Sequence, residues 1–370
     1  MGRMRIALVL AVLCGVAFLV VSRVEPGRAR QPVASPPPPP PRVVRHARPR
    51  PGPVRPQFVV VSFDGSGGIR LWPYWRSVAR RAHAHFTFFV SGVYLLPEGQ
   101  RARYHAPHHA AGVSDIWFAR PDLGLSAPQV VRRTLREIAG AYREGHEIGT
   151  HFNGHFCEPY QGNVDEWTAA DWSRELDQFF GLLFASPGAL PFGPREIVGE
   201  RTPCLQGRLP VLYRVLARRG FLYDASALAP LGSWPLRRLG IWSIPLLEIP
   251  FPGHTFPVVS MDYNLFANQT GGVSGPASLE PQIERETYLT LRGAFRRLYR
   301  GNRAPFVYGS HFETWNHWAY NRALARFLLE TCRLPDVRCV SYRELVDWLE
   351  RRGRTSSPKR RIRSSSPSSS

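Results

Sequence analysis

Two histidines four residues apart, His151 and His155, are the part of the chain best suited to metal chemistry. Neutral imidazole is the commonest protein ligand for zinc-like ions. A separation of four can place both rings on one side of a helical turn, where they can share one ion. Such pairs also arise by chance as surface histidines, so the interpretation depends on the polar residues found elsewhere along the chain.

Those polar residues lie directly after predicted strands. Hydrophobic runs that stop at glycine or polar residues predict strands at 58–63, 85–90, 147–150, 244–249, 257–261, 305–309 and 337–340. Helices are predicted at 72–83, 128–144, 169–185, 209–219, 287–299, 320–330 and 341–351. This alternation indicates an α/β fold with a mostly parallel sheet. Asp64, His151, Asp262 and His311 each follow a strand, and in a parallel barrel such strand ends share one face.

The motif at 145–155, GHEIGTHFNGH, resembles the second motif of the polysaccharide deacetylases, the NodB-homology group known as carbohydrate esterase family 4. Further segments are similar to family segments in the same order: HFTFFVSG at 85–92, RTPC at 201–204, GFLYDAS at 220–226 and the strand 242–250. Ser310 and His311 lie where a leucine-x-histidine motif closes the family's site. The resemblance extends over about 58–350 and includes every motif region.

This resemblance implies a distorted (β/α)-barrel that removes the acetyl group from an N-acetylated glycan such as a cell-wall polymer. The family uses a divalent metal, usually zinc, which activates a water molecule. By position in the motifs, the resemblance implies that His151 and His155 are metal ligands, and that Asp64 is the general base with Arg201 as its orienting partner. It implies that His311 is the general acid and that Asp262 is the aspartate that tunes this acid. The backbone N–H of Cys204 is the implied oxyanion contact.

One departure from the family pattern concerns the metal itself. The family's first motif carries two adjacent aspartates, and Gly65 stands where the second one would supply the metal's carboxylate ligand. Phe152 replaces a serine or threonine of the second motif, and Cys204 replaces an aromatic residue. Three interpretations follow. Asp64 turns to the metal, or water or Asp262 completes a two-histidine site, or the chain has lost metal chemistry. The last would leave a silent glycan-binding protein or a hydrolase of a non-sugar amide.

Charge and composition describe the ends of the chain. The formal net charge is +20, of which residues 1–57 carry +9 and residues 351–370 carry +7, leaving +4 for 58–350. This distribution argues against a nucleic-acid-binding fold. It predicts two basic arms that lie against an anionic membrane or cell-wall polymer, or that have no partner. The Pro/Arg-rich residues 24–57 predict an extended linker, and the Arg/Ser-rich residues 351–370 predict a disordered tail.

The N-terminus carries an export signal. Arg3 and Arg5 precede an apolar run at 6–21, which predicts a signal-anchor or signal peptide over 1–23. We expect the domain at 58–350 to be extracytoplasmic and membrane-anchored, with secretion as the alternative. Export makes disulfides plausible. Cys332 and Cys339 would close a short loop, and Cys157–Cys204 then follows by elimination.

Residues 97–125 fit no regular element and predict an insertion over the strand-end face or its rim. The insertion contains three histidines that have the chemistry to bind metal, although an exposed loop is the better interpretation: His105, His108 and His109. Three tryptophans near the expected site are candidates for stacking on sugar rings or for the core: Trp117, Trp315 and Trp318.

Overall fold

The computed structural model describes residues 55–356 of the 370-residue chain. The predicted anchor at 1–23, nearly all of the linker at 24–57 and the last fourteen residues of the predicted tail lie outside the described residues. Within the described range, no helix combines the length and apolar character needed to cross a membrane.

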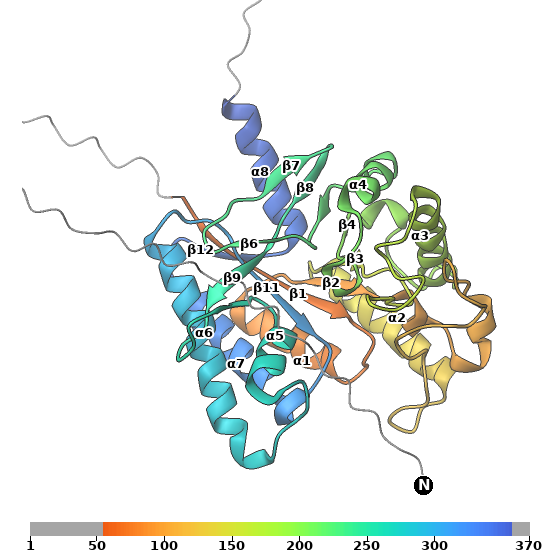
Figure 1. The fold of residues 1–370 in the computed structure, drawn as a ribbon, viewed down its shortest axis with the longest axis horizontal. Coiled ribbons are helices and arrows are strands. Elements are labelled where there is room, and N and C mark those ends of the chain that lie inside the picture. The colour runs from red at the N-terminus through yellow and green to blue at the C-terminus, as the bar shows by residue number, and fades with distance from the viewer. Residues whose placement is uncertain (1–54, 357–370) are drawn as a thin grey trace, which may run out of the picture. The chain divides into compact units, whose positions relative to one another are not determined.

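A curled sheet forms the centre of the domain (Figure 1). Its strands are β11 (Phe306–His311), β1 (Gln57–Gly65), β2 (Thr87–Val90), β3 (Glu147–Thr150), β4 (Gly199–Glu200), β5 (Tyr223–Asp224), β8 (Ile241–Ser243) and β7 (Leu236–Arg238), in that spatial order. All neighbours on this path are parallel except the β7–β8 hairpin. β12 (Val337–Val340) pairs with the first half of β1.

The sheet is a distorted (β/α)-barrel, as predicted, because its late strand β11 returns to lie beside β1. A small second sheet of β6 (Leu228–Pro230), β9 (Leu246–Pro250) and β10 (Pro257–Val259) fills the interval between β8 and β11. There the Gly309 N–H donates to the Ser260 carbonyl at 2.9 Å, and the Ser260 N–H donates to the Leu247 carbonyl at 2.8 Å. Irregular hydrogen bonds therefore replace a continuous ladder at this point.

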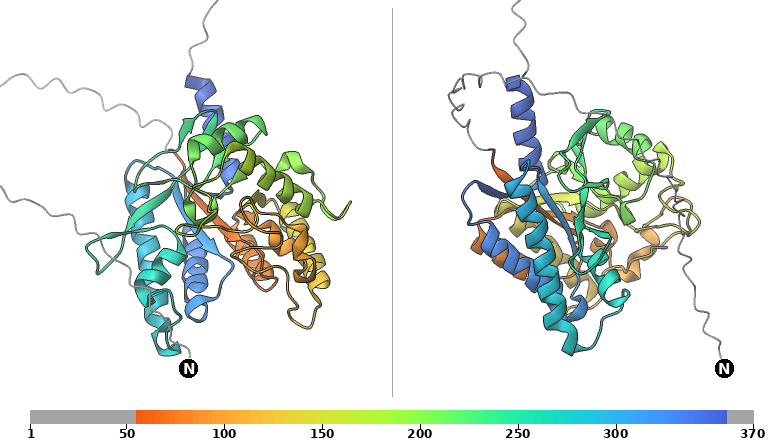
Figure 2. Two further views of the ribbon diagram at one scale, coloured as in Figure 1. Left: turned by 45° about the vertical axis from the view of Figure 1, so that its right-hand side comes forward. Right: turned by 60° about the vertical axis from the view of Figure 1, so that its left-hand side comes forward.

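Helices pack around the outside of this sheet, as the rotated views in Figure 2 also show. They are α1 (Leu71–Ala82), α2 (Ala127–Arg143), α3 (Ala169–Leu183), α4 (Leu209–Arg218), α5 (Asp262–Thr270), α6 (Glu280–Arg300), α7 (Trp315–Thr331) and α8 (Tyr342–Ser356). Under them lies an aromatic core in which Phe63 of β1 contacts Trp75, Phe86, Phe88 and Phe312 at centroid distances of 4.5–5.7 Å. Burial of these rings is a main stabilising contribution to the barrel.

The predicted elements are present, with several shifts. α6 begins at Glu280, seven residues before the predicted start. α7 opens at Trp315 with a turn in which residues 316–318 have positive φ, so its regular right-handed part begins close to the predicted residue 320. α8 starts with a capping box of Ser341 and Glu344 and continues to Ser356, beyond its predicted end at 351. Helix α5 and the β7–β8 hairpin were not predicted.

The insertion at 97–125 contains only a short 3-10 helix, Glu98–Arg103, and isolated bridges. Two of its histidines make structural contacts. His108 lies 3.2 Å from the Asp171 carboxylate, and His109 lies 3.2 Å from the Gly162 carbonyl. His105 and His108 are exposed, as the preferred interpretation of an exposed loop expects, whereas His109 is half-buried.

Candidate active site

The strand ends bring the predicted polar residues to one level of the barrel. In the parallel pairing of β1 with β11, Asp64 stands opposite His311. In the pairing of β2 with β3, Val90 stands opposite Thr150, the residue before His151. Register along the sheet therefore places Asp64, His151 and His311 at the same edge, as expected for a parallel barrel.

Asp64 is bound by a buried arginine. The Arg201 Nη1 atom lies 2.8 Å from Asp64 Oδ1, and both residues are buried, with 0% and 3% of their surface exposed. Arg201 also donates to Ser62 Oγ at 2.7 Å, to the Tyr342 hydroxyl at 2.7 Å and to the Ala225 carbonyl at 2.9 Å. The guanidinium is thus fixed by four partners, and it fixes the carboxylate in turn.

The charge of Asp64 follows from this environment. Burial by itself would raise the pKa of the carboxyl, but Arg201 lowers it, and His151 and His311 lower it further. The net pKa lies below the usual value, so the buried carboxylate is ionised at neutral pH.

His151 and His155 lie side by side, with ring centroids 5.1 Å apart. His151 Nδ1 is 2.8 Å from the Arg201 carbonyl, which only accepts, so this nitrogen carries the hydrogen and Nε2 is free to bind an ion. Burial lowers the pKa of both rings, that of His155 to about 3, and both are therefore neutral. The predicted helical turn is wrong, because Phe152 and His155 have φ of 56° and 62° and the segment is an irregular loop.

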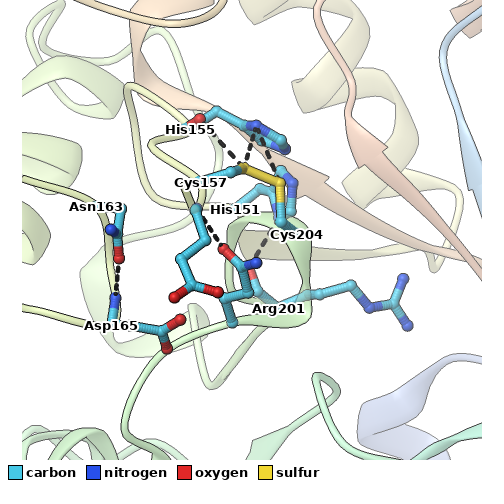
Figure 3. The surroundings of a disulfide bond; sticks show 9 residues. His151, His155, Cys157, Asn163, Asp165, Arg201 and Cys204 are labelled. Atoms are coloured by element: carbon cyan, nitrogen blue, oxygen red, sulfur yellow. Dashed lines mark hydrogen bonds between the residues drawn. A yellow bond between two sulfur atoms is a disulfide. The ribbon is translucent and has the colours of Figure 1, made fainter. Parts of the chain in front are cut away.

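Both predicted disulfides are present, Cys332–Cys339 and Cys157–Cys204. The second joins the loop after β3 to the loop after β4 beside the histidine pair (Figure 3). His155 Nδ1 lies 3.5 Å from Cys157 Sγ and 3.9 Å from Cys204 Sγ. These three residues are the one group of three His, Cys, Asp or Glu within residues 55–356 whose ligand atoms lie within 4.8 Å of one another. Because both sulfurs are bonded to each other, this group is not a metal site.

His311 and Asp262 form the second charged pair. His311 Nδ1 lies 2.7 Å from Asp262 Oδ1, and Asp262 Oδ2 accepts from the His311 N–H at 2.7 Å and from Ser310 Oγ at 2.8 Å. Burial would lower the pKa of His311, but the Asp262 carboxylate beside it outweighs burial, and the pKa is raised. The arrangement holds the ring in one orientation and favours its protonated form.

A cavity of about 210 Å³ gathers these residues, and Asp64, Gly65, His151, His155 and His311 all line it. Its remaining wall includes several aromatic side chains and one further carboxylate, among them Tyr94, Trp117, Tyr263, Trp315 and Glu313.

Three of the predicted residues do not line the cavity. Arg201 and Asp262 act from behind Asp64 and His311. Cys204 is exposed and is not a lining residue, although its Sγ lies 3.9 Å from Nδ1 of His155, which lines the cavity. The oxyanion contact of its backbone N–H stays a prediction. Among the candidate tryptophans, Trp117 and Trp315 line the cavity, whereas Trp318 packs on Tyr74 with centroids 5.3 Å apart.

The donor types in the cavity fit a zinc-like ion, although among the described residues no carboxylate oxygen and the ligand nitrogens of His151 and His155 all lie within 4.8 Å of one another. Two neutral imidazoles are adjacent, His151 presents Nε2, and the Asp64 and Glu313 carboxylates line the same cavity. This is the two-histidine, one-carboxylate set of many hydrolytic zinc sites. Glu313 was missed in the sequence, because it lies two residues beyond the end of β11 and belongs to no motif.

Gly65 differs from an aspartate in more than its missing carboxylate. Its φ is +78°, in the left-handed region that side chains disfavour. A Cβ atom at this position would lie 3.3 Å from Tyr94 Cε2, and one at Gly67 would lie 2.4 Å from the same ring. The Tyr94 ring therefore lies against this loop, on the side where a residue-65 side chain would begin.

The variants Gly65→Asp and Gly65→Ala compare a carboxylate with a methyl group at position 65. We expect Gly65→Asp and Gly65→Ala each to lower the free energy of unfolding by about 1–2 kcal/mol, because both place a Cβ in the left-handed region. We expect Gly65→Asp to bind zinc at least about tenfold more tightly than Gly65→Ala, by the contribution of a direct ligand. Urea unfolding and calorimetric zinc titration give the two readouts. Equal zinc affinities would show that position 65 does not face the ion.

Comparisons with known proteins place this fold among solved structures. No protein-family model matches the chain, and no curated protein matches it. A candidate polysaccharide deacetylase from Mycobacterium smegmatis is 15% identical, with 84% of this chain and 96% of that chain covered and a TM-score of 0.49. A family 4 carbohydrate esterase pseudoenzyme from Bacillus anthracis is 12% identical over 80% and 70% of the two chains, with a TM-score of 0.42.

A family 4 carbohydrate esterase from Streptomyces lividans, solved with acetate, is 12% identical over 75% of this chain and 90% of that chain, with a TM-score of 0.36. The fold of the chain is a distorted (β/α)-barrel. What it does is argued below from its own cavity.

Proposed function

We propose that the protein is an extracytoplasmic hydrolase that removes acetyl groups from an N-acetylated glycan. The observation that carries the proposal is the convergence of two charged pairs, Asp64–Arg201 and His311–Asp262, and two neutral histidines at one cavity. The predicted export segment and the two disulfides support a location outside the cytoplasm.

The chemistry divides between the two charged pairs. A divalent ion bound by His151 and His155 would polarise the acetyl carbonyl and acidify water. Asp64 is ionised, and Arg201 occupies Oδ1, so Asp64 can accept the proton of the attacking water at its other oxygen.

The second pair serves the leaving group. His311 is held at Nδ1 by Asp262, so its Nε2–H can protonate the sugar nitrogen as the C–N bond breaks. Acetate and the free amine are the products. The aromatic side chains Tyr263 and Trp315, which lie 6.2 Å and 5.3 Å from the His311 ring by centroid, can stack on the sugar beside this acid.

A second candidate is a catalytically silent glycan-binding protein on the same barrel. Gly65 favours it, because the carboxylate that would complete the metal site is absent and Tyr94 lies against that position. Hydrolysis of a non-sugar amide is a further alternative at the same cavity.

The decisive experiment measures metal content and acetate release together. The purified full-length protein is loaded with zinc, and acetate release is followed on a panel of N-acetylated oligosaccharides. We expect His151→Ala to lose the bound metal and the activity, whereas His105→Ala, a change at an exposed histidine of the insertion, should keep both. A wild-type protein that binds these glycans without metal and without releasing acetate would support the silent glycan-binding protein instead.

A further inference from the structure

A second cavity, of about 820 Å³, lies between α4 and strands β6 and β7, away from the candidate active site. Three leucines that line it are strongly exposed: Leu228 at 50%, Leu236 at 56% and Leu239 at 54%. Trp234 adds an aromatic side chain, and Arg208 and Arg238 add two cations. We call these six residues the leucine surface. Exposed apolar residues gathered in this way mark a binding surface more often than single ones do.

The presence of a leucine at position 239 is not explained by packing within the domain. It forms the two-residue turn of the β7–β8 hairpin together with Gly240, and their φ angles are 49° and 87°. Turns of this kind favour asparagine, aspartate or glycine, because both residues have positive φ. A leucine here is strained and still exposes half of its surface. An apolar partner outside the domain would account for this choice of residue.

The surroundings of the leucine surface are basic. Arg237 and Arg238 are exposed on β7, and α4 carries exposed Arg214 and Arg218. The hairpin turn lies at the end of α4, since a Cβ at Gly240 would be 3.9 Å from Ala217. Arg237 is paired with Glu350 at 2.9 Å, whereas Arg238 has no acidic partner among residues 55–356. A partner with both apolar and anionic parts matches this combination.

Both ends of the described chain lie at this surface. The Arg55 guanidinium lies 5.8 Å from the Trp234 ring, and Trp234 stacks on Trp348 of α8 at 6.1 Å. Beyond Arg55 are residues 1–54, with nine arginines, one glutamate and the apolar run 6–21. Beyond α8 are residues 357–370, with four basic residues and no acid. The described chain therefore begins, at Arg55, beside Trp234 of the leucine surface, and α8 packs on the same tryptophan.

The candidate active site lies at the other end of β1. Trp348 packs on Phe58 near the start of this strand, with centroids 4.8 Å apart, while Asp64 stands near its end. Six residues of extended strand span about 20 Å. In Figure 1, α8 and β7 lie beside each other at one end of the domain. Glu350 of α8 contacts Arg237 of β7 and Trp242 of β8.

We propose that the leucine surface docks the domain on an anionic phospholipid bilayer. The leucines and Trp234 enter the interface, and the surrounding arginines contact lipid phosphates. The proposal stands whether or not the cavity hydrolyses a glycan.

Charge favours a bilayer over the two other occupants. The chain's own residues 24–54 are basic, and they would bring positive charge to a surface that already carries Arg208 and Arg238. A second copy related by two-fold symmetry would set the same arginines against each other. An anionic lipid supplies both the opposite charge and the apolar chain.

The test uses the full-length protein and a polarity-sensitive dye. Cys14 is the one cysteine outside the two disulfides, so Cys14→Ser gives a background for single labelling. The dye is attached through Leu239→Cys, or through Leu289→Cys on α6 as the control, where the native leucine is 38% exposed. In nanodiscs containing phosphatidylglycerol, we expect the Leu239 dye alone to shift to shorter wavelength and to be quenched by brominated lipid.

Two further arms make each outcome decisive. The shift should be largely lost in phosphatidylcholine nanodiscs and in the Arg238→Glu variant, because the arginines would lose their anionic partner. Equal emission from the two dyes in phosphatidylglycerol would overturn the proposal. A spectral shift of the Leu239 dye that needs no lipid and grows with protein concentration would also overturn the proposal, because it indicates a second copy. A shift that persists in dilute lipid-free protein would overturn it as well, because it indicates that the chain's own N-terminal segment covers the surface.

Discussion

Arg201→Met is expected to lower the free energy of unfolding by about 3–5 kcal/mol, the usual cost of removing one partner of a buried ion pair. The change leaves the Asp64 carboxylate buried without its cation. It also removes donors from Ser62 Oγ, the Tyr342 hydroxyl and the Ala225 carbonyl. Urea unfolding of the wild type and the variant measures the difference.

A matched control variant distinguishes the loss of a buried ion pair from the loss of an exposed one. Arg219 pairs with Asp177 at 2.6 Å, but 65% of the aspartate side chain is exposed. Arg219→Met should therefore cost less than about 1 kcal/mol. The double variant Arg201→Met with Asp64→Asn should be more stable than Arg201→Met alone, because it removes the unpaired charge. If Arg201→Met were no more costly than Arg219→Met, the account of Asp64 as a carboxylate dependent on Arg201 would be wrong.

The fold was predictable where strands are long, apolar and buried. β1, β2 and β11 appear in the sequence as hydrophobic runs that end at polar residues, and every residue of these runs up to the last is buried. The β7–β8 hairpin lacks such a signal, because β7 is fully exposed and carries two arginines. Helix α5 was missed for the same reason, since its nine residues include only two buried apolar side chains, Leu265 and Phe266.

The candidate site divides in the same way. Asp64, His151, His155 and His311 could be predicted because each follows a strand, and the register of a parallel sheet carries them to one edge. Tyr94 and Glu313 lie after strand ends without a motif of their own, and only the folded chain shows that they line the cavity. The helical turn failed because Phe152 and His155 adopt positive φ, which the spacing of two histidines does not reveal.

His311→Ala should lower kcat for deacetylation by about 10²–10⁴-fold, the range typical of a general acid. The loss should fall mainly on kcat, because protonation of the leaving nitrogen belongs to the chemical step. His317→Ala is the matched control, since the side chain of that exposed histidine lies 3.2 Å from the Gly275 carbonyl and does not line the cavity. A His311→Ala protein with normal kcat and a correct fold would remove His311 from the mechanism.

Asp262→Asn tests the same acid through its pKa. A general acid works in its protonated form, so activity is lost as the pH rises through the pKa of His311. In the folded protein burial lowers this pKa and the Asp262 carboxylate raises it above the usual value. An asparagine keeps the shape and removes the charge, so the alkaline limb of the kcat/KM profile should move to lower pH. Asp347→Asn, at an exposed residue of α8, should leave the limb in place. If Asp262→Asn reduced the rate without moving the limb, Asp262 would be a structural residue that does not tune the acid.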